Sequence, residues 1–175
     1  MGRKRQRTIG RGWPVSPSTA FVFLLVLVGS HAMEGCSGMN QTDDVLGMKI
    51  AAVPSAKPCG TLLMVSPGSM LQEYEFVRGE IRFRAGVDQA GIVVYLATSD
   101  PAFQTPEGIR VGTLLEKVLP LATGAMKKES GWAYYVTLPS GWNTAFTQGE
   151  TMTEGTLPAT SSVRWLFRRK YVIRD

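Results

Sequence analysis

The sequence predicts an α+β fold, with short capped helices packed on an antiparallel sheet that is built from two related strand–helix–strand–strand units. Three observations predict this fold: two helix-capping sequences, several segments with the two-residue periodicity of strands, and an internal repeat. Residues 59–175 are expected to form a single domain, because a segment of this length suits one hydrophobic core.

Two segments have the pattern of a helix N-terminus. Residues 69–72 (S-x-x-Q) and 113–116 (T-x-x-E) each form a capping box, whose side chains satisfy free backbone N–H groups of the first turn. Gly79 is expected to end the first helix, and Pro120 limits the second. The apolar positions on one helical face are Met70, Leu71, Tyr74 and Val77 in the first, and Leu114, Leu115, Val118 and Leu119 in the second.

The remaining apolar segments predict strands. Some alternate between apolar and charged residues, as a half-buried strand does, and others are short apolar runs bounded by Gly or Pro. The predicted strands lie at residues 48–53, 60–65, 80–84, 92–98, 132–138, 143–147 and 163–173.

Two short matches at nearly the same offset suggest an internal repeat. Residues 68–72 match 112–116 at an offset of 44, and residues 102–104 match 145–147 at an offset of 43. The repeat would explain the second capping box as scaffolding, since a strand must turn there into a short helix. The two units are predicted at residues 61–105 and 109–150.

The N-terminus has the pattern of a secretory signal. Five basic residues lie between positions 3 and 11, and an uncharged apolar run follows at residues 19–29. We expect residues 1–32 to be the signal peptide and residues 33–58 to be a polar tether. The remaining chain has 14 basic and 14 acidic residues, so its neutral balance argues against binding to nucleic acid.

The chain after the signal has no histidine, because His31 lies within the signal segment. This excludes Ser-His and Cys-His catalysis and any histidine metal site in the mature chain. The acidic residues fall mostly in predicted turns, caps and solvent-facing strand positions. We therefore expect no catalytic site, no metal site, no cofactor and no enzymatic activity.

The two cysteines allow two incompatible interpretations. Cys36 and Cys59 could form one disulfide, which an oxidising compartment permits. Alternatively, the sequence MEGC ending at Cys36 resembles a bacterial lipobox, which implies that Cys36 is the lipid-attachment residue of a lipoprotein. In that case Cys59 is a lone thiol, and the chain is anchored to a membrane by its lipid.

One segment resembles a pattern found in small secreted proteins and lipoproteins of bacteria, mostly of unknown function. It reads D-x-x-F-x-T-x-x-G-I-x-V-G and comprises Asp100, Phe103, Thr105, Gly108, Ile109, Val111 and Gly112. The repeated arrangement is also similar, over residues 61–147, to the SmpA/OmlA-type outer-membrane lipoproteins and to the β-lactamase-inhibitor-protein fold. This likeness implies a protein-binding component of the cell envelope.

These observations predict an exported, envelope-associated protein, periplasmic or attached to the outer membrane, with a structural or protein-interaction role. An envelope protein is the expected partner. The competing hypothesis is a cell-wall-binding module, because the Gly-Trp pairs ending at Trp132 and Trp142 resemble those of bacterial SH3-like modules. The basic run at residues 168–170 is interpreted as the charged protection of an edge strand.

Overall fold

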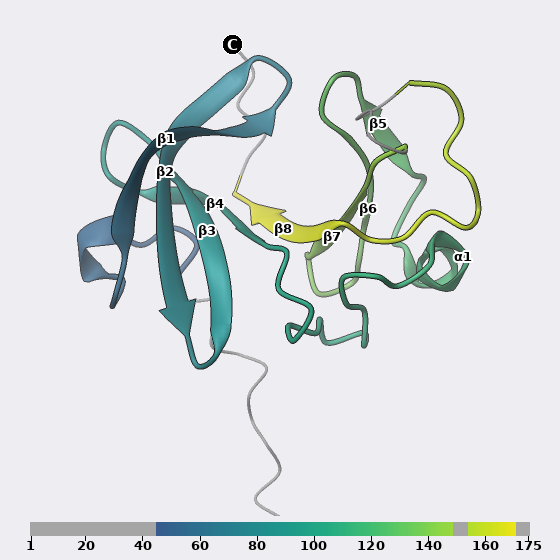
Figure 1. Cartoon of the computed structure of the whole chain (residues 1–175), viewed down its shortest axis with the longest axis horizontal. Coiled ribbons are helices and arrows are strands. Elements are labelled where there is room, and N and C mark those ends of the chain that lie inside the picture. The colour runs from purple at the N-terminus through teal and green to yellow at the C-terminus, as the bar shows by residue number, and fades with distance from the viewer. Residues whose placement is uncertain (1–44, 149–153, 171–175) are drawn as a thin grey trace, which may run out of the picture. The chain divides into compact units, whose positions relative to one another are not determined.

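The computed structural model describes residues 45–148 and 154–170, which form an eight-stranded antiparallel sheet (Figure 1). The strand order is β1-β2-β3-β4-β8-β7-β6-β5. The strands are β1 (Lys57–Ser66), β2 (Ser69–Arg78), β3 (Ile81–Val87), β4 (Val93–Thr98), β5 (Lys127–Glu129), β6 (Ala133–Thr137), β7 (Asn143–Phe146) and β8 (Trp165–Arg169). The described helices are α1 (Leu115–Val118) and two 3₁₀ turns, η1 (Ile50–Ala52) and η2 (Leu119–Leu121).

The prediction of an α+β fold is wrong, because the fold is mostly β. The first predicted helix is strand β2, and it follows β1 through a tight turn at Pro67 and Gly68. Gly68 has a φ of +74°, which glycine adopts without strain, and Ser66 pairs with Ser69 directly across the turn. A hairpin turn followed by aromatic and β-branched residues therefore outweighs the capping pattern.

The second predicted helix exists, but it is short and differently capped. Helix α1 has Leu114 at its N-cap position, without a side-chain capping bond. The hydroxyl of Thr113 instead accepts a hydrogen bond from the N–H of Arg110 at 3.1 Å. Since β2 stands where the first unit should have its helix, the two proposed units do not share one strand–helix–strand–strand structure.

The second half of the predicted tether belongs to the fold. Val45 and Val53 are buried in the main core, and Lys49 forms a single bridge with Ile92. The strand predicted at residues 48–53 is the 3₁₀ turn η1, and β1 already begins at Lys57. The tether was predicted from the polar residues before position 45 and from Pro54 and Pro58, although residues 45–53 are mostly apolar.

Strand β8 occupies the middle of the sheet, between β4 and β7 (Figure 1). The interpretation of residues 168–170 as part of an edge strand is therefore wrong. Within this run, the side chain of Arg169 contacts Glu129, Tyr135 and the carbonyl of Val65. The edge strands are β1 and β5, of which the sequence predicted only the first, as a buried strand.

Hydrophobic residues cover both faces of the sheet. The main core lies on one face, where α1 and the long loops pack on Phe83, Leu96 and Leu166. A second, smaller core lies on the other face around Tyr95 and Phe167. Neighbouring residues of β4 and of β8 thus point into different cores, as the alternation of a strand requires.

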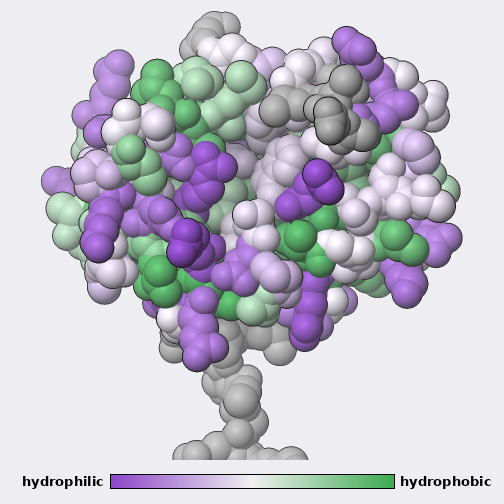
Figure 2. Space-filling model, in the orientation of Figure 1, coloured by the Kyte–Doolittle hydropathy of each residue, from purple (hydrophilic) through white to green (hydrophobic). Residues whose placement is uncertain are grey.

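The sheet bends so that its two edge regions approach each other on the second face. The indole N–H of Trp132, in the β5–β6 turn, donates to the carbonyl of Met64 in β1 at 3.2 Å. Arg169 of β8 donates to the carbonyl of Val65 at 3.3 Å. Hydrophilic and hydrophobic residues are mixed over the face of the molecule shown in Figure 2. Within the described residues, no helix has the length and apolar character needed to span a membrane.

Candidate functional site

A pocket of about 320 Å³ opens on the second face, where β1 approaches β8. Leu62, Leu63 and Met64 of β1 line it, together with Tyr95 and Ala97 of β4. Leu62 is 60% exposed, although it is a large apolar residue. Exposed apolar side chains beside a concave surface are typical of a binding site.

Two tryptophans line the same pocket. The rings of Trp132 and Trp165 meet edge to face, with centroids 6.0 Å apart and planes at 72°. The N–H of Trp132 is already used, because it donates to the carbonyl of Met64. The rings therefore offer the pocket mainly apolar surface, which suits an aliphatic or aromatic ligand.

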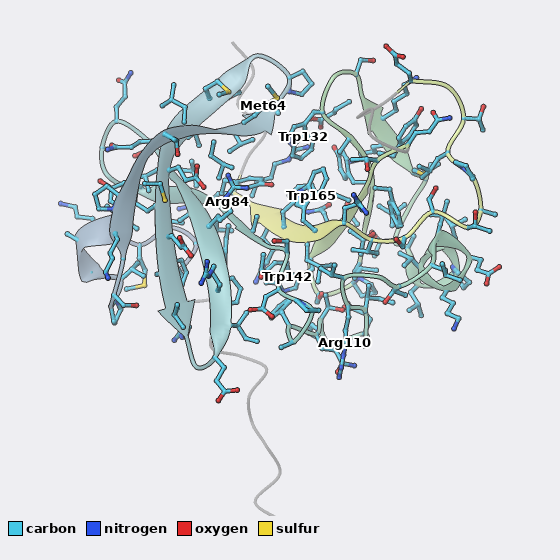
Figure 3. All side chains as sticks on the ribbon, viewed as in Figure 1. Met64, Arg84, Arg110, Trp132, Trp142 and Trp165 are labelled. Atoms are coloured by element: carbon cyan, nitrogen blue, oxygen red, sulfur yellow. The ribbon has the colours of Figure 1, made fainter. Side chains whose placement is uncertain are left out.

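Two arginines with different surroundings complete the lining. The guanidinium of Arg84 binds the buried carboxylate of Glu73, which also accepts a hydrogen bond from Thr61 at 2.8 Å. Arg164 is exposed, and its side chain has no polar partner among the described residues. In Figure 3, Arg84 and Trp165 lie side by side near the centre of the view, with Met64 and Trp132 above them. The pocket thus combines apolar walls with one unpaired positive charge.

A partly buried ion pair supports the tryptophan side of the pocket. Arg169 contacts Glu129 at 2.6 Å and the hydroxyl of Tyr135 at 2.7 Å. The guanidinium of Arg169 also lies over the Trp132 ring, 5.4 Å from its centroid. Together with its bond to Val65, these contacts tie β8 to the β5–β6 turn and to β1. They hold Trp132 in place beside the pocket.

Burial and hydrogen bonding set the pKa values in this cluster. Burial opposes ionisation of Glu129, but hydrogen bonds from Arg169 and Tyr135 outweigh it and lower the pKa of Glu129. Burial, with the bond to Glu129, raises the pKa of Tyr135 to about 12. Glu129 is therefore charged and Tyr135 is neutral near neutral pH, which is the arrangement that keeps all three groups paired.

The carboxyl groups of Glu73 and Glu107 also form hydrogen bonds within the fold. The pKa of Glu73 is lowered, mainly by its bond with Arg84. The pKa of Glu107 is lowered because hydrogen bonds from Ser140 outweigh its burial. A general acid at neutral pH needs a raised pKa, and these carboxyl groups have the opposite shift. Within residues 45–148 and 154–170, no three His, Cys, Asp or Glu side chains are placed to hold a metal ion.

The residues that the sequence analysis selected do not come together in a site. Cys36 lies outside the described residues, whereas Cys59 of β1 is an exposed free thiol. Desolvation and the nearby Glu73 raise the pKa of this thiol, which lowers its reactivity. Trp132 and Trp142 lie in different cores, the first beside the pocket and the second against Phe103.

The sequence analysis missed Arg164 and Trp165 as site residues. A single strand was predicted at residues 163–173, but Val163 packs in the main core while Trp165 packs in the second. The alternation of apolar and charged residues at 163–168 predicts a strand. This local pattern does not indicate that β8 lies at the centre of the sheet, opposite β1 across the pocket.

Comparisons with known proteins give little further information. No known protein family matches the chain, and no curated protein matches it significantly. Among solved structures, the crystal structure of the uncharacterized protein yfeY from Escherichia coli is similar, with a TM-score of 0.47 and 16% sequence identity. The similarity covers 69% of this chain and 84% of that chain.

Proposed function

We propose that this chain is an exported, envelope-associated binding protein without catalytic activity, and that the pocket between β1 and β8 is its binding site. The observation that carries this proposal is the pocket itself. Its apolar lining includes two tryptophan rings, and the N–H of Trp132 is already bonded, so a bound molecule would gain mainly by leaving water.

The proposal of export rests on the sequence. A basic segment followed by an uncharged apolar run of this length is typical of a secretory signal. The lipobox-like residues before Cys36 would place the chain at a membrane by lipid attachment, which is compatible with a binding role in the envelope.

The proposal of a non-catalytic role rests on the condition of the acidic groups. Glu73 and Glu129 are each held by an arginine and a hydroxyl. A carboxylate held in this way is stabilised in its charged form and makes a poor proton donor. A binding site does not need such a donor.

The experiment is a ligand screen followed by nuclear magnetic resonance of the tryptophan indole N–H groups. The mature chain is titrated with an alkyl carboxylate, an alkyl alcohol, an alkylamine and a small aromatic compound. We expect at least one of them to shift the signals of Trp132 and Trp165 in a saturable way, while the Trp142 signal stays in place. If none shifts them, or if all indoles shift alike, the proposal fails.

A pair of variants distinguishes the pocket from the rest of the surface. Leu62 lines the pocket and Met70 does not, but both are exposed apolar residues of the β1–β2 hairpin. Leu62→Glu should weaken binding of the ligand found, because it introduces a charge into the apolar lining. Met70→Glu should leave binding unchanged. Equal effects of the two changes would contradict this location.

A further inference from the structure

We propose that the pocket between β1 and β8 selects an amphipathic anion, a carboxylate attached to an apolar chain or ring. The carboxylate would pair with Arg164, and the apolar part would lie against Trp132 and Trp165. This inference rests on the proposed function, since it names the class of ligand for the same site.

The charge of the lining supports an anion. Among the described residues that line it, the charged ones are Arg84 and Arg164, and none is acidic. Arg84 is neutralised by Glu73, whereas Arg164 has no polar partner among the described residues. A guanidinium beside an apolar surface pairs best with a planar carboxylate, which can accept two parallel hydrogen bonds. A cationic ligand would be repelled.

The apolar surface supports a ligand with a hydrophobic part next to its charge. Leu62 and Met64 remain exposed at the pocket, at 60% and 39%, although burial would stabilise both. The edge-to-face tryptophan pair offers a slot for a chain or a ring. A small inorganic anion would leave this surface in contact with water, so the apolar part is needed for appreciable affinity.

The backbone hydrogen bonds at the edge of β1 favour a small molecule as the ligand over a peptide that adds a strand to the sheet. A peptide that extended the sheet along β1 would need the outward carbonyl groups of that strand. The carbonyls of Met64 and Val65 already accept hydrogen bonds from Trp132 and Arg169. Strand addition at this place would have to break both bonds, whereas a small ligand beside the tryptophans would break neither.

The test compares octanoate, octanol and octylamine, which share one alkyl chain and differ in charge. Binding to the mature chain is measured by the change in tryptophan fluorescence and by calorimetry at low salt. We expect octanoate to bind about tenfold more tightly than octanol, the scale of one hydrogen-bonded charge pair. Octylamine should bind most weakly. Added salt should reduce the advantage of octanoate, because the ion pair is exposed.

Arginine variants assign this preference to one residue. Arg164→Gln should reduce octanoate binding to the level of octanol, and Arg164→Lys should retain part of the difference. Arg110→Gln is the matched control, because Arg110 is exposed, does not line the pocket, and its guanidinium binds only Gln104 among the described residues. Both positions are exposed, so the fold should tolerate these changes.

The outcomes separate this inference from the proposed function. If octanol and octanoate bind equally at Trp132 and Trp165, and Arg164→Gln has no effect, the inference is overturned while an apolar binding site remains. If octylamine binds best, the inference is likewise overturned. If no compound of the screen shifts these indole signals, the proposed function itself fails.

Discussion

The indole N–H of Trp132 lies 3.2 Å from the carbonyl oxygen of Met64, a residue 68 positions earlier in the chain. This bond joins the β5–β6 turn to the edge strand β1 on the face that holds the pocket. Through this bond the two edge regions of the sheet contact each other. The bond therefore fixes the distance between the β1 side and the Trp132 side of the pocket.

Replacing Trp132 with phenylalanine should loosen β1. The change keeps an aromatic ring in the second core but removes the donor to Met64, which should lower the free energy of unfolding by about 1 kcal/mol. Hydrogen exchange should accelerate in β1 more than in β6. Trp142→Phe, in the main core, is the control and should leave exchange in β1 unchanged. Equal exchange in β1 for both variants would contradict this role of Trp132.

The ion pair between Glu129 and Arg169 should make the free energy of unfolding depend on pH. Because the pKa of Glu129 is lowered in the folded chain, its charge stabilises the fold at neutral pH. This contribution is present above the pKa of an ordinary glutamate and is lost as the pH falls through the lower folded value.

Glu129→Gln should therefore cost on the order of 2 kcal/mol at pH 7, the scale of hydrogen bonds to a charged group. It should cost much less near pH 3. Urea unfolding at the two pH values measures both costs. The exposed Glu80, which has no bond among the described residues, provides the control variant Glu80→Gln. A cost for Glu129→Gln that is the same at both pH values would show that the charge of this residue does not act in this way.

Gly86 should not tolerate a side chain. A Cβ atom there would lie 3.0 Å from Leu71, 3.1 Å from Tyr95 and 3.1 Å from Val65, beneath the pocket. Gly86→Ala should lower the free energy of unfolding by about 1 kcal/mol or more through overpacking. Gly124→Ala is the matched control, because nothing lies within 4 Å of its Cβ position. Equal urea midpoints for the two variants would show that the second core is not packed as described.

The cysteines give a separate prediction about export. We expect a membrane-bound species that begins at Cys36 with added acyl mass, and a free thiol at Cys59. Intact mass of each cell fraction measures the first, and alkylation of the native chain measures the second. Because the pKa of Cys59 is raised, its alkylation at pH 8 should be slower than that of an unstructured peptide. A processed species two hydrogens lighter than its reduced form would instead establish the disulfide between Cys36 and Cys59.

The strands that the sequence predicted correctly are those with strong local signals. The alternation around Phe83 marks β3, and the apolar run containing Leu96 marks β4, because these patterns depend only on neighbouring residues. The segment after Gly68 was misread for a similar reason. Its apolar residues Met70, Leu71, Tyr74 and Val77 have the spacing of one helical face, but the segment is a strand whose buried residues are Ser69, Glu73 and Phe76.

The pocket could not be predicted because it depends on contacts between distant residues. Trp165 begins the last strand and Arg164 directly precedes it, whereas Leu62 and Met64 belong to the first strand. Their approach follows from the insertion of β8 beside β4 and from the bend of the sheet, and neither leaves a local pattern in the sequence. The absence of histidine from the mature chain could be read directly, because composition needs no fold.

The most direct test of the central claim is to measure intermolecular nuclear Overhauser effects between octanoate and the mature chain. We expect contacts from the alkyl protons to the indole rings of Trp132 and Trp165, and none to Trp142, with the carboxylate end nearest Arg164. This result would place the ligand in the pocket between β1 and β8 in the proposed orientation. Contacts to Trp142 alone, or none at a concentration that saturates binding, would contradict the account.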